Sequence, residues 1–235
     1  MSRLVKTLVA VATVFAFVAS ASAAPTVIKF GLGDTGPDLV HFGSSFETLS
    51  DGNLATTGDQ DTNVDYVGPL GFLADLANAS FSLDAVTLSG LANVLGGGFF
   101  AQATTGGAFS FFGPANELLL SGTIGNGTLS GVIGSSVGSW LSASVTFVGG
   151  IIAPYLDANS GAISISLTDV ESNGVSGFSV GGCGQGQFGE VCTLDNFTAD
   201  ATGNIEGAAV PEPATMGLLG LGLLGAGAAR RRKSA

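Results

Sequence analysis

A period-two alternation of apolar and small polar side chains recurs along the middle of this chain and restricts the folds open to it. In residues 162–168 the Ile and Leu side chains alternate with Ser and Thr, and residues 142–147 repeat the pattern. Successive side chains of an extended strand point to opposite faces, so both segments predict antiparallel strands with one buried face. Further strands are predicted at 27–30, 40–46, 81–88, 108–112, 117–124, 128–133 and 194–201.

Turn signals separate these short segments. Gly125-Asn126-Gly127 lies between two of them, and Asn-Gly is typical of a tight hairpin turn with positive φ. The predicted fold class is therefore all-β, an antiparallel sandwich of the jelly-roll kind. A β-solenoid is the alternative, but Leu-Ser-Gly recurs at Leu88, Leu120 and Leu129 without a fixed period.

The N-terminus has the layout of a secretory signal peptide. Arg3 and Lys6 precede an apolar run at 8–18, and Ala21-Ser22-Ala23 provides two small residues at the positions that signal peptidase reads. The sequence predicts a signal peptide over 1–23, cleaved after Ala23. The alternative is an uncleaved N-terminal anchor, for which the apolar run is short.

The C-terminus carries a second composite signal. Val210, Pro211, Glu212 and Pro213 form a segment in which two prolines remove backbone donors, so we expect it to be exposed and unpaired. The apolar run 216–229 would reach about 21 Å as a helix against about 30 Å of bilayer hydrocarbon, which suits a temporary membrane hold. The basic cluster that follows would stay cytoplasmic by the positive-inside rule; it consists of Arg230, Arg231, Arg232 and Lys233.

Together, the Pro-Glu-Pro, the short Gly/Leu segment and the Arg-rich end resemble the PEP-CTERM sorting signal of Gram-negative bacteria that make exopolysaccharide, a tail also labelled as an ice-binding protein C-terminal domain. The resemblance implies an inner-membrane intermediate, recognition by an exosortase, removal of the tail, and release or attachment of the body at the cell surface or in the extracellular matrix. GPI and LPxTG signals share the layout, but the Pro-Glu-Pro fits neither. The expected organisation is a signal peptide (1–23), an exported domain (24–209) and a sorting signal (210–235).

Without its two ends the chain is strongly anionic. Residues 24–209 keep one cation, Lys29, against seventeen acidic residues, a formal charge of about −16. Such a surface cannot neutralise phosphates, which excludes nucleic acid as a partner. Cations, neutral or basic glycans and other copies of the chain remain.

Cys183 and Cys192 are the only cysteines, and they enclose a Gly-rich loop. In an exported body two cysteines are expected to pair as a disulfide. A zinc site would need two more ligands, and the spacing is not that of a redox pair.

One acidic segment suggests a cation site. Asp59, Asp61, Asn63 and Asp65 place oxygen ligands at alternate positions, a pattern that could converge on Ca²⁺, the only cofactor that the sequence suggests. As an EF-hand loop the segment fails, because Val64 replaces the required glycine and Leu70 the bidentate glutamate. The favoured interpretation is a solvated acidic loop between strands, and a calcium site is the alternative.

Enzyme motifs are weak. Ser136 and Ser179 each sit in a G-x-S-x-G pattern, but in α/β-hydrolases the histidine follows the serine, whereas the only histidine, His41, precedes both. We therefore expect no enzymatic activity; a hydrolase that uses two carboxylates is the remaining alternative. The predicted role is structural or adhesive within exopolysaccharide or biofilm, with a glycan- or calcium-binding module as the alternative.

Overall fold

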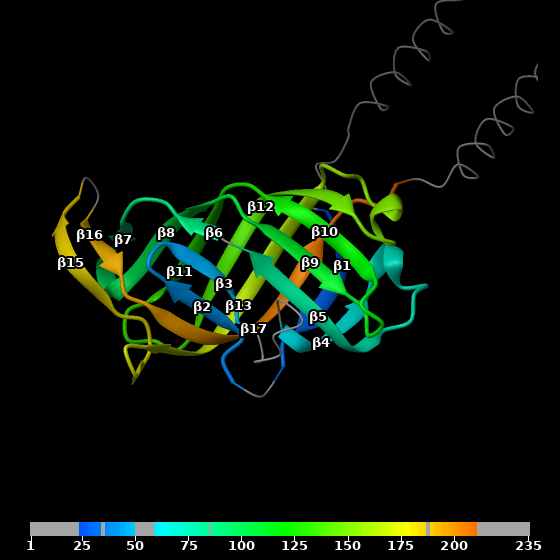
Figure 1. Cartoon of the computed structure of the whole chain (residues 1–235). Helices are drawn as coiled ribbons and strands as arrows, with labels where there is room; N and C mark the ends of the chain where they lie inside the picture. The colour runs from blue at the N-terminus through cyan, green and yellow to red at the C-terminus, as the bar shows by residue number, and fades with distance from the viewer. Residues whose placement is uncertain (1–23, 34–35, 50–58, 85, 187–188, 211–235) are drawn as a thin grey trace, which may run out of the picture.

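The computed structural model describes residues 24–33, 36–49, 59–84, 86–186 and 189–210 (Figure 1). These residues form strands joined by turns and three short 3₁₀ helices, η1 (Gly68–Leu70), η2 (Gly96–Gly98) and η3 (Ala153–Tyr155). The strands are β1 (Thr26–Gly31), β2 (Leu39–Phe42), β3 (Ser45–Thr48), β4 (Asp59–Tyr66), β5 (Leu76–Asp84), β6 (Val86–Leu88), β7 (Ala92–Val94), β8 (Phe99–Thr105), β9 (Ala108–Phe112), β10 (Leu118–Ile124), β11 (Gly127–Val132), β12 (Gly138–Gly149), β13 (Gly161–Ser172), β14 (Val175–Ser176), β15 (Val180–Gln185), β16 (Glu190–Leu194) and β17 (Phe197–Glu206).

The predicted all-β, antiparallel fold class is confirmed. Each pair of neighbouring strands in the described parts of the chain runs antiparallel. A β-solenoid stacks its strands in parallel, so that alternative does not apply to this body.

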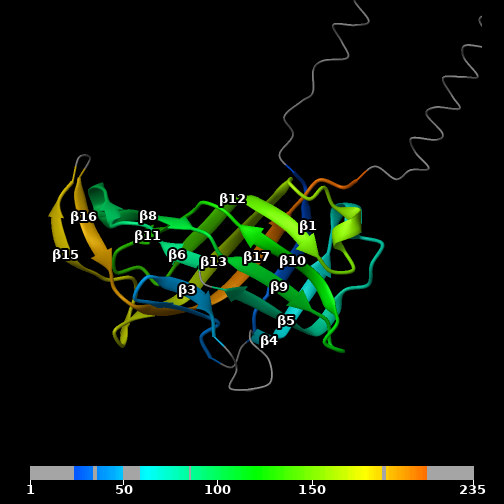
Figure 2. The same cartoon turned by 45° about the horizontal axis from the view of Figure 1, so that its top comes forward.

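Three long strands organise the molecule. β13 pairs with β12 on one side and with β17 on the other, and we call these three strands the central layer. One group of shorter strands, β1, β4, β5, β9 and β10, links β17 to β12 at one end of this layer. A second group, β2, β3, β6, β8 and β11, links the same two strands at the other end (Figures 1 and 2).

Each group of shorter strands encloses its own aromatic cluster. In the first, the ring of Phe30 packs against those of Phe81 and Phe111, with centroids 4.7 and 5.1 Å away. In the second, Phe197 contacts Phe46 and Phe178. All of these side chains are buried, so alternation along the strands places their apolar faces between the layers.

Glycines in the long strands make room for these rings. A Cβ at Gly138 would lie 2.7 Å from ring carbons of Phe178, and one at Gly203 would meet the ring of Phe30. Such contacts are closer than van der Waals packing allows. The high glycine content thus serves core packing as well as turns.

The predicted hairpin at Gly125-Asn126-Gly127 is wrong. β10 and β11 do not pair with each other; both run along β12, with Ile124 opposite Val145 and Thr128 opposite Leu141. None of the three residues has a positive φ. The link is an interruption in one long strand: a Cβ at Gly125 would meet Ser144, and one at Gly127 would meet Thr104. Close approach, not turn conformation, requires the glycines.

Other boundaries also differ from the sequence prediction. The segment 40–46 is not one strand but the hairpin of β2 and β3, turned at Gly43 with φ of 65°. β8 was not predicted because two of its inward side chains, Gln102 and Thr104, are polar. Both have partners: Gln102 Nε2 donates to the carbonyl of Ser89, and Thr104 Oγ1 accepts from Trp140 Nε1.

The two predicted transport signals, 1–23 and 211–235, lie outside the described residues. The part of the chain that the structure describes contains no helix with the length and hydropathy needed to span a bilayer.

Candidate functional site

The junction between body and sorting signal is held by backbone hydrogen bonds. Ala209 bridges to Leu156, and the N–H of Val210 donates to the carbonyl of Tyr155 at 3.0 Å. The N–H of Gly207 donates to the carbonyl of Pro25, so both ends of the body are fixed at the same end of the molecule. Val210 is 46% exposed, in agreement with the sequence prediction. The prediction that its backbone is unpaired is wrong, because its N–H has a hydrogen-bond partner.

The other residues of the two predicted signals are not among those that the structure describes. They include Ala21, Ala23, Pro211, Glu212, Pro213, Arg230, Arg231, Arg232 and Lys233.

A groove of about 290 Å³ opens beside this junction, and we call it the terminal groove. Its walls come from three parts of the chain that are distant in sequence: the end of β4 through the start of β5, the start of β10, and the loop from β12 to η3. The lining residues are Tyr66, Leu73, Ala74, Leu76, Glu117, Leu119, Ile151, Ile152 and Tyr155.

Two exposed aromatic rings lie at the terminal groove: Tyr155 lines it, and Phe72 contacts Tyr155. Phe72 is 65% exposed and Tyr155 48% exposed, and their rings meet edge to face with centroids 5.5 Å apart. Ile151 beside them is also exposed. Large apolar side chains that remain exposed together indicate an interaction surface.

The charged residues at the terminal groove are acidic: Glu117 lines it, and Asp75 lies beside Tyr66. Burial raises the pKa of the Tyr66 hydroxyl, and the negative charges of Glu117 and Asp75 raise it further. Glu117 accepts a hydrogen bond from the N–H of Ala115 at 3.0 Å, and Asp75 accepts one from the N–H of Tyr66 at 2.9 Å. The single Lys or Arg between residues 24 and 209 is Lys29, which does not line the groove. The groove therefore has negative potential and favours neutral or cationic ligands.

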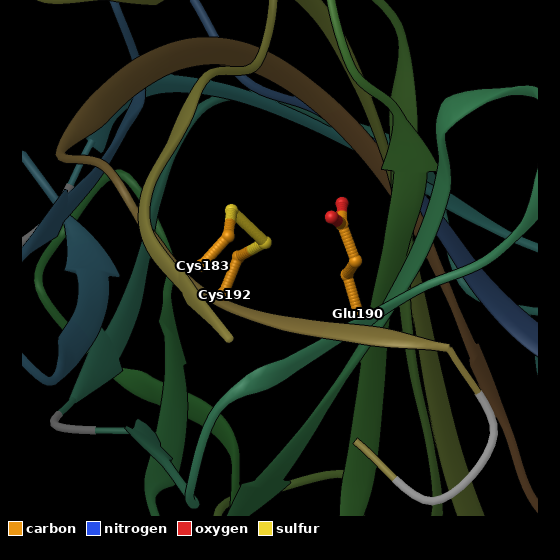
Figure 3. Close-up of side chains that lie close together, drawn as sticks. All are labelled: Cys183, Glu190 and Cys192. Atoms are coloured by element: carbon orange, nitrogen blue, oxygen red, sulfur yellow. A yellow bond between two sulfur atoms is a disulfide. The ribbon is translucent and has the colours of Figure 1, made fainter. Parts of the chain in front are cut away.

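The disulfide hairpin, β15 and β16, occupies the opposite end of the body (Figure 1). Cys183 and Cys192 are bonded, as predicted, with their Cα atoms 4.1 Å apart (Figure 3). The carboxylate of Glu190 lies within 4.8 Å of the two sulfur atoms. Because both sulfurs are consumed in the disulfide, these three side chains do not make a thiolate metal site.

The acidic segment is part of a strand, so its interpretation as a loop is wrong. Asp59–Tyr66 forms β4, paired with β5 and β1. Asn63 and Asp65 are exposed, whereas Thr62, Val64 and Tyr66 are buried. The side chains of Asp59 and Asp61 lie outside the described residues. In an extended strand, alternate residues are about 6.6 Å apart, which is wide for ligands of one Ca²⁺.

His41 is a buried residue of β2 and packs on the ring of Phe197. Its Nδ1 lies 3.1 Å from the carbonyl of Asp195, which makes Nδ1 the protonated nitrogen, and its Nε2 has no hydrogen-bond partner within the described residues. Burial lowers the pKa of His41. Ser179 donates to the carboxylate of Asp195 at 2.7 Å. His41 therefore contacts the backbone carbonyl of Asp195, and Ser179 contacts its carboxylate.

A second groove, also of about 290 Å³, lies on the outer face near β2 and the start of β17. Its lining includes Phe42, Glu171, Asn173, Asn196 and Thr198. It offers an exposed aromatic ring and a carboxylate away from the terminal groove.

Comparison with known proteins assigns the tail. Residues 209–233 match the family model of the PEP-CTERM protein-sorting motif. The chain is thus an exported protein of all-β fold whose tail is read by an exosortase, and the resemblance noted in the sequence is confirmed. The motif implies sorting to the cell surface. No curated protein and no solved structure matches the chain.

Proposed function

We propose that the mature body is a structural or adhesive component of an exopolysaccharide matrix. The observation that carries the proposal is the sorting motif itself, which matches residues 209–233 and whose first two residues, Ala209 and Val210, are hydrogen-bonded to the body just before the Pro-Glu-Pro. An exosortase cut at the Pro-Glu-Pro would therefore release an intact folded unit. Its large negative charge keeps such a unit soluble and away from polyanions.

In this proposal the tail acts only during export. The run 216–229 holds the chain in the inner membrane while Arg230 to Lys233 remain cytoplasmic, and exosortase removes both. Signal peptidase removes 1–23 after Ala23. The body then needs no catalytic activity and no cofactor to act in the matrix.

The intact mass of the protein recovered from the medium tests the export step. We expect a mass that lacks both 1–23 and the residues after the Pro-Glu-Pro. A variant with Pro211→Ala, Glu212→Ala and Pro213→Ala should retain its tail and stay with the cells, while a Glu206→Ala control should be processed normally. A full-length product in the cytosol would refute the proposal.

Co-sedimentation with purified matrix polysaccharide tests the role of the body. The processed protein should sediment with the polysaccharide, and a protein that remains in the supernatant would refute a structural or adhesive role. The second candidate function, a glycan-binding module, is favoured by the exposed rings and carboxylate of the terminal groove.

A further inference from the structure

The terminal groove combines aromatic side chains with an acidic one. Tyr155, Tyr66 and Glu117 line it, and the ring of Phe72 packs edge to face on that of Tyr155. A flat ligand that stacks on an aromatic face and also carries a hydrogen-bonding or cationic group would satisfy both.

The negative charge of the groove further restricts the class of ligand that it can bind. Glu117 and Asp75 both act on Tyr66, and the body has a single Lys or Arg with which to neutralise seventeen acids. A uronic acid or a sulfated sugar would be repelled, whereas a protonated amine would be attracted both to the carboxylate and to the faces of the aromatic rings. The negative potential thus selects basic ligands over acidic ones.

The shape of the groove favours a sugar over a basic peptide. At about 290 Å³ it lies near the lower end of the range for small-molecule sites, and it is a groove beside two rings set edge to face. A pyranose ring offers a flat apolar face for stacking, which a flexible lysine side chain lacks. Hydroxyl groups around the sugar ring can also donate to Glu117 and exchange hydrogen bonds with Tyr66.

We propose that the terminal groove binds an amino sugar with a free, protonated amine, as a unit of a partly deacetylated polysaccharide. The sugar ring stacks on Tyr155, which Phe72 supports edge to face, and the ammonium group lies against Glu117. This inference rests on the proposed matrix function and names its ligand. It also places the glycan at the end of the body where residue 210 leads into the sorting signal.

The test is a calorimetric titration of the protein recovered from producing cells with two tetrasaccharides of the same linkage, at a pH at which the amines are protonated. One is a fully deacetylated glucosamine tetramer and the other its N-acetylated form. We expect the deacetylated tetramer to bind at least tenfold more tightly. Equal affinities, or binding of neither, would overturn the proposal.

Variants assign the binding to named side chains. Glu117→Gln keeps the shape of the side chain and removes its charge, so it should weaken binding of the deacetylated tetramer about tenfold and leave the N-acetylated one unchanged. Tyr155→Ala should weaken both at least tenfold, and Tyr155→Phe, which keeps the ring, should restore both. An unchanged affinity in Glu117→Gln would overturn the proposal even if Tyr155→Ala failed to fold.

Matched controls come from the second groove. Phe42→Ala and Glu171→Gln remove an exposed ring and a carboxylate there, and both variants should bind as the unchanged protein does. A loss in these variants would overturn the assignment, as would a lysine tetrapeptide that competes for the terminal groove with equal affinity.

If the unchanged protein sediments with matrix polysaccharide but binds neither tetramer, the groove assignment alone fails. If it does not sediment, the matrix function fails.

Discussion

The central layer and the disulfide hairpin are held together in different ways. In β13, alternate residues are buried and both edges are paired. In β15 no residue is buried, and β16 is its only neighbour; among described strands longer than two residues, β15 alone has a single partner. The central layer is therefore stabilised by apolar burial, whereas β15 is held by its pairing with β16 and by the covalent bond between these two strands.

The two regions therefore depend on different sources of stability. A strand with no buried face contributes little hydrophobic free energy, so it opens locally unless something else restrains it. The disulfide acts where burial is lacking. Changes in the central layer should lower global stability, and changes in the hairpin should act locally.

The largest effect is expected for Trp140→Ala in β12. Trp140 is fully buried, and its Nε1 donates to Thr104 at 3.0 Å. The substitution creates a cavity and leaves a buried hydroxyl without its partner, so it should lower the free energy of unfolding by about 3–5 kcal/mol. Denaturant titration measures this loss.

The neighbouring Leu141 provides the control. It is 51% exposed on the other face of the same strand, so Leu141→Ala should change stability by no more than about 0.5 kcal/mol. Equal losses in the two variants would contradict the assignment of the two faces.

Reducing the disulfide should have the next largest effect, confined to the hairpin. Opening a loop of this length removes about 2–3 kcal/mol of restraint, which corresponds to roughly a hundredfold faster amide exchange in β15, residues 180–185. The denaturation midpoint of the central layer should change little, because β15 contributes no buried side chains. If Cys183→Ala with Cys192→Ala lowered global stability as much as Trp140→Ala does, the hairpin would not be an independent unit.

The same contrast explains what the sequence could predict. The long strands were found because alternation is strong where one face is buried, and the disulfide because an exported body had only two cysteines. β4 was missed because its outward residues are acidic enough to resemble a loop, although Thr62, Val64 and Tyr66 point inward. The Gly125–Gly127 break was misread because Asn-Gly is a turn signal only when the chain reverses, and here β12 holds it extended.

The terminal groove could not be predicted from sequence. Its aromatic and acidic side chains are separated by about half of the body's length and come together only when β4, β10 and η3 meet. Neither exposed rings nor isolated acids form a pattern that a sequence scan would select.

The pH dependence of stability should report the contact between His41 of β2 and Phe197 of the central layer. Burial against Phe197 lowers the pKa of His41 below 6.5, its ordinary value. The unfolded chain therefore takes up a proton first, so this contribution to stability is fully present above pH 6.5 and is lost as the pH falls below it. The slope from this group should be at most about 1.4 kcal/mol per pH unit. His41→Leu should flatten the profile between pH 7 and 5; identical profiles for the unchanged protein and His41→Leu would contradict the assignment.

The smallest effect is expected from calcium, because β4 spaces its acidic side chains along an extended strand. One ion would meet at most two of them, which predicts an affinity no better than the millimolar range of weak extracellular sites. At 1 mM Ca²⁺ and a similar dissociation constant, binding would stabilise the fold by about 0.4 kcal/mol, roughly 1–2 °C in the midpoint of a thermal melt. Adding a chelator should therefore lower the midpoint of the thermal melt by no more than this amount. The Asp65→Asn variant should show an equally small shift. A drop of several degrees that Asp65→Asn abolishes would instead show that β4 and its neighbours form a tight calcium site, and that bound cations join burial and the disulfide as a third source of stability.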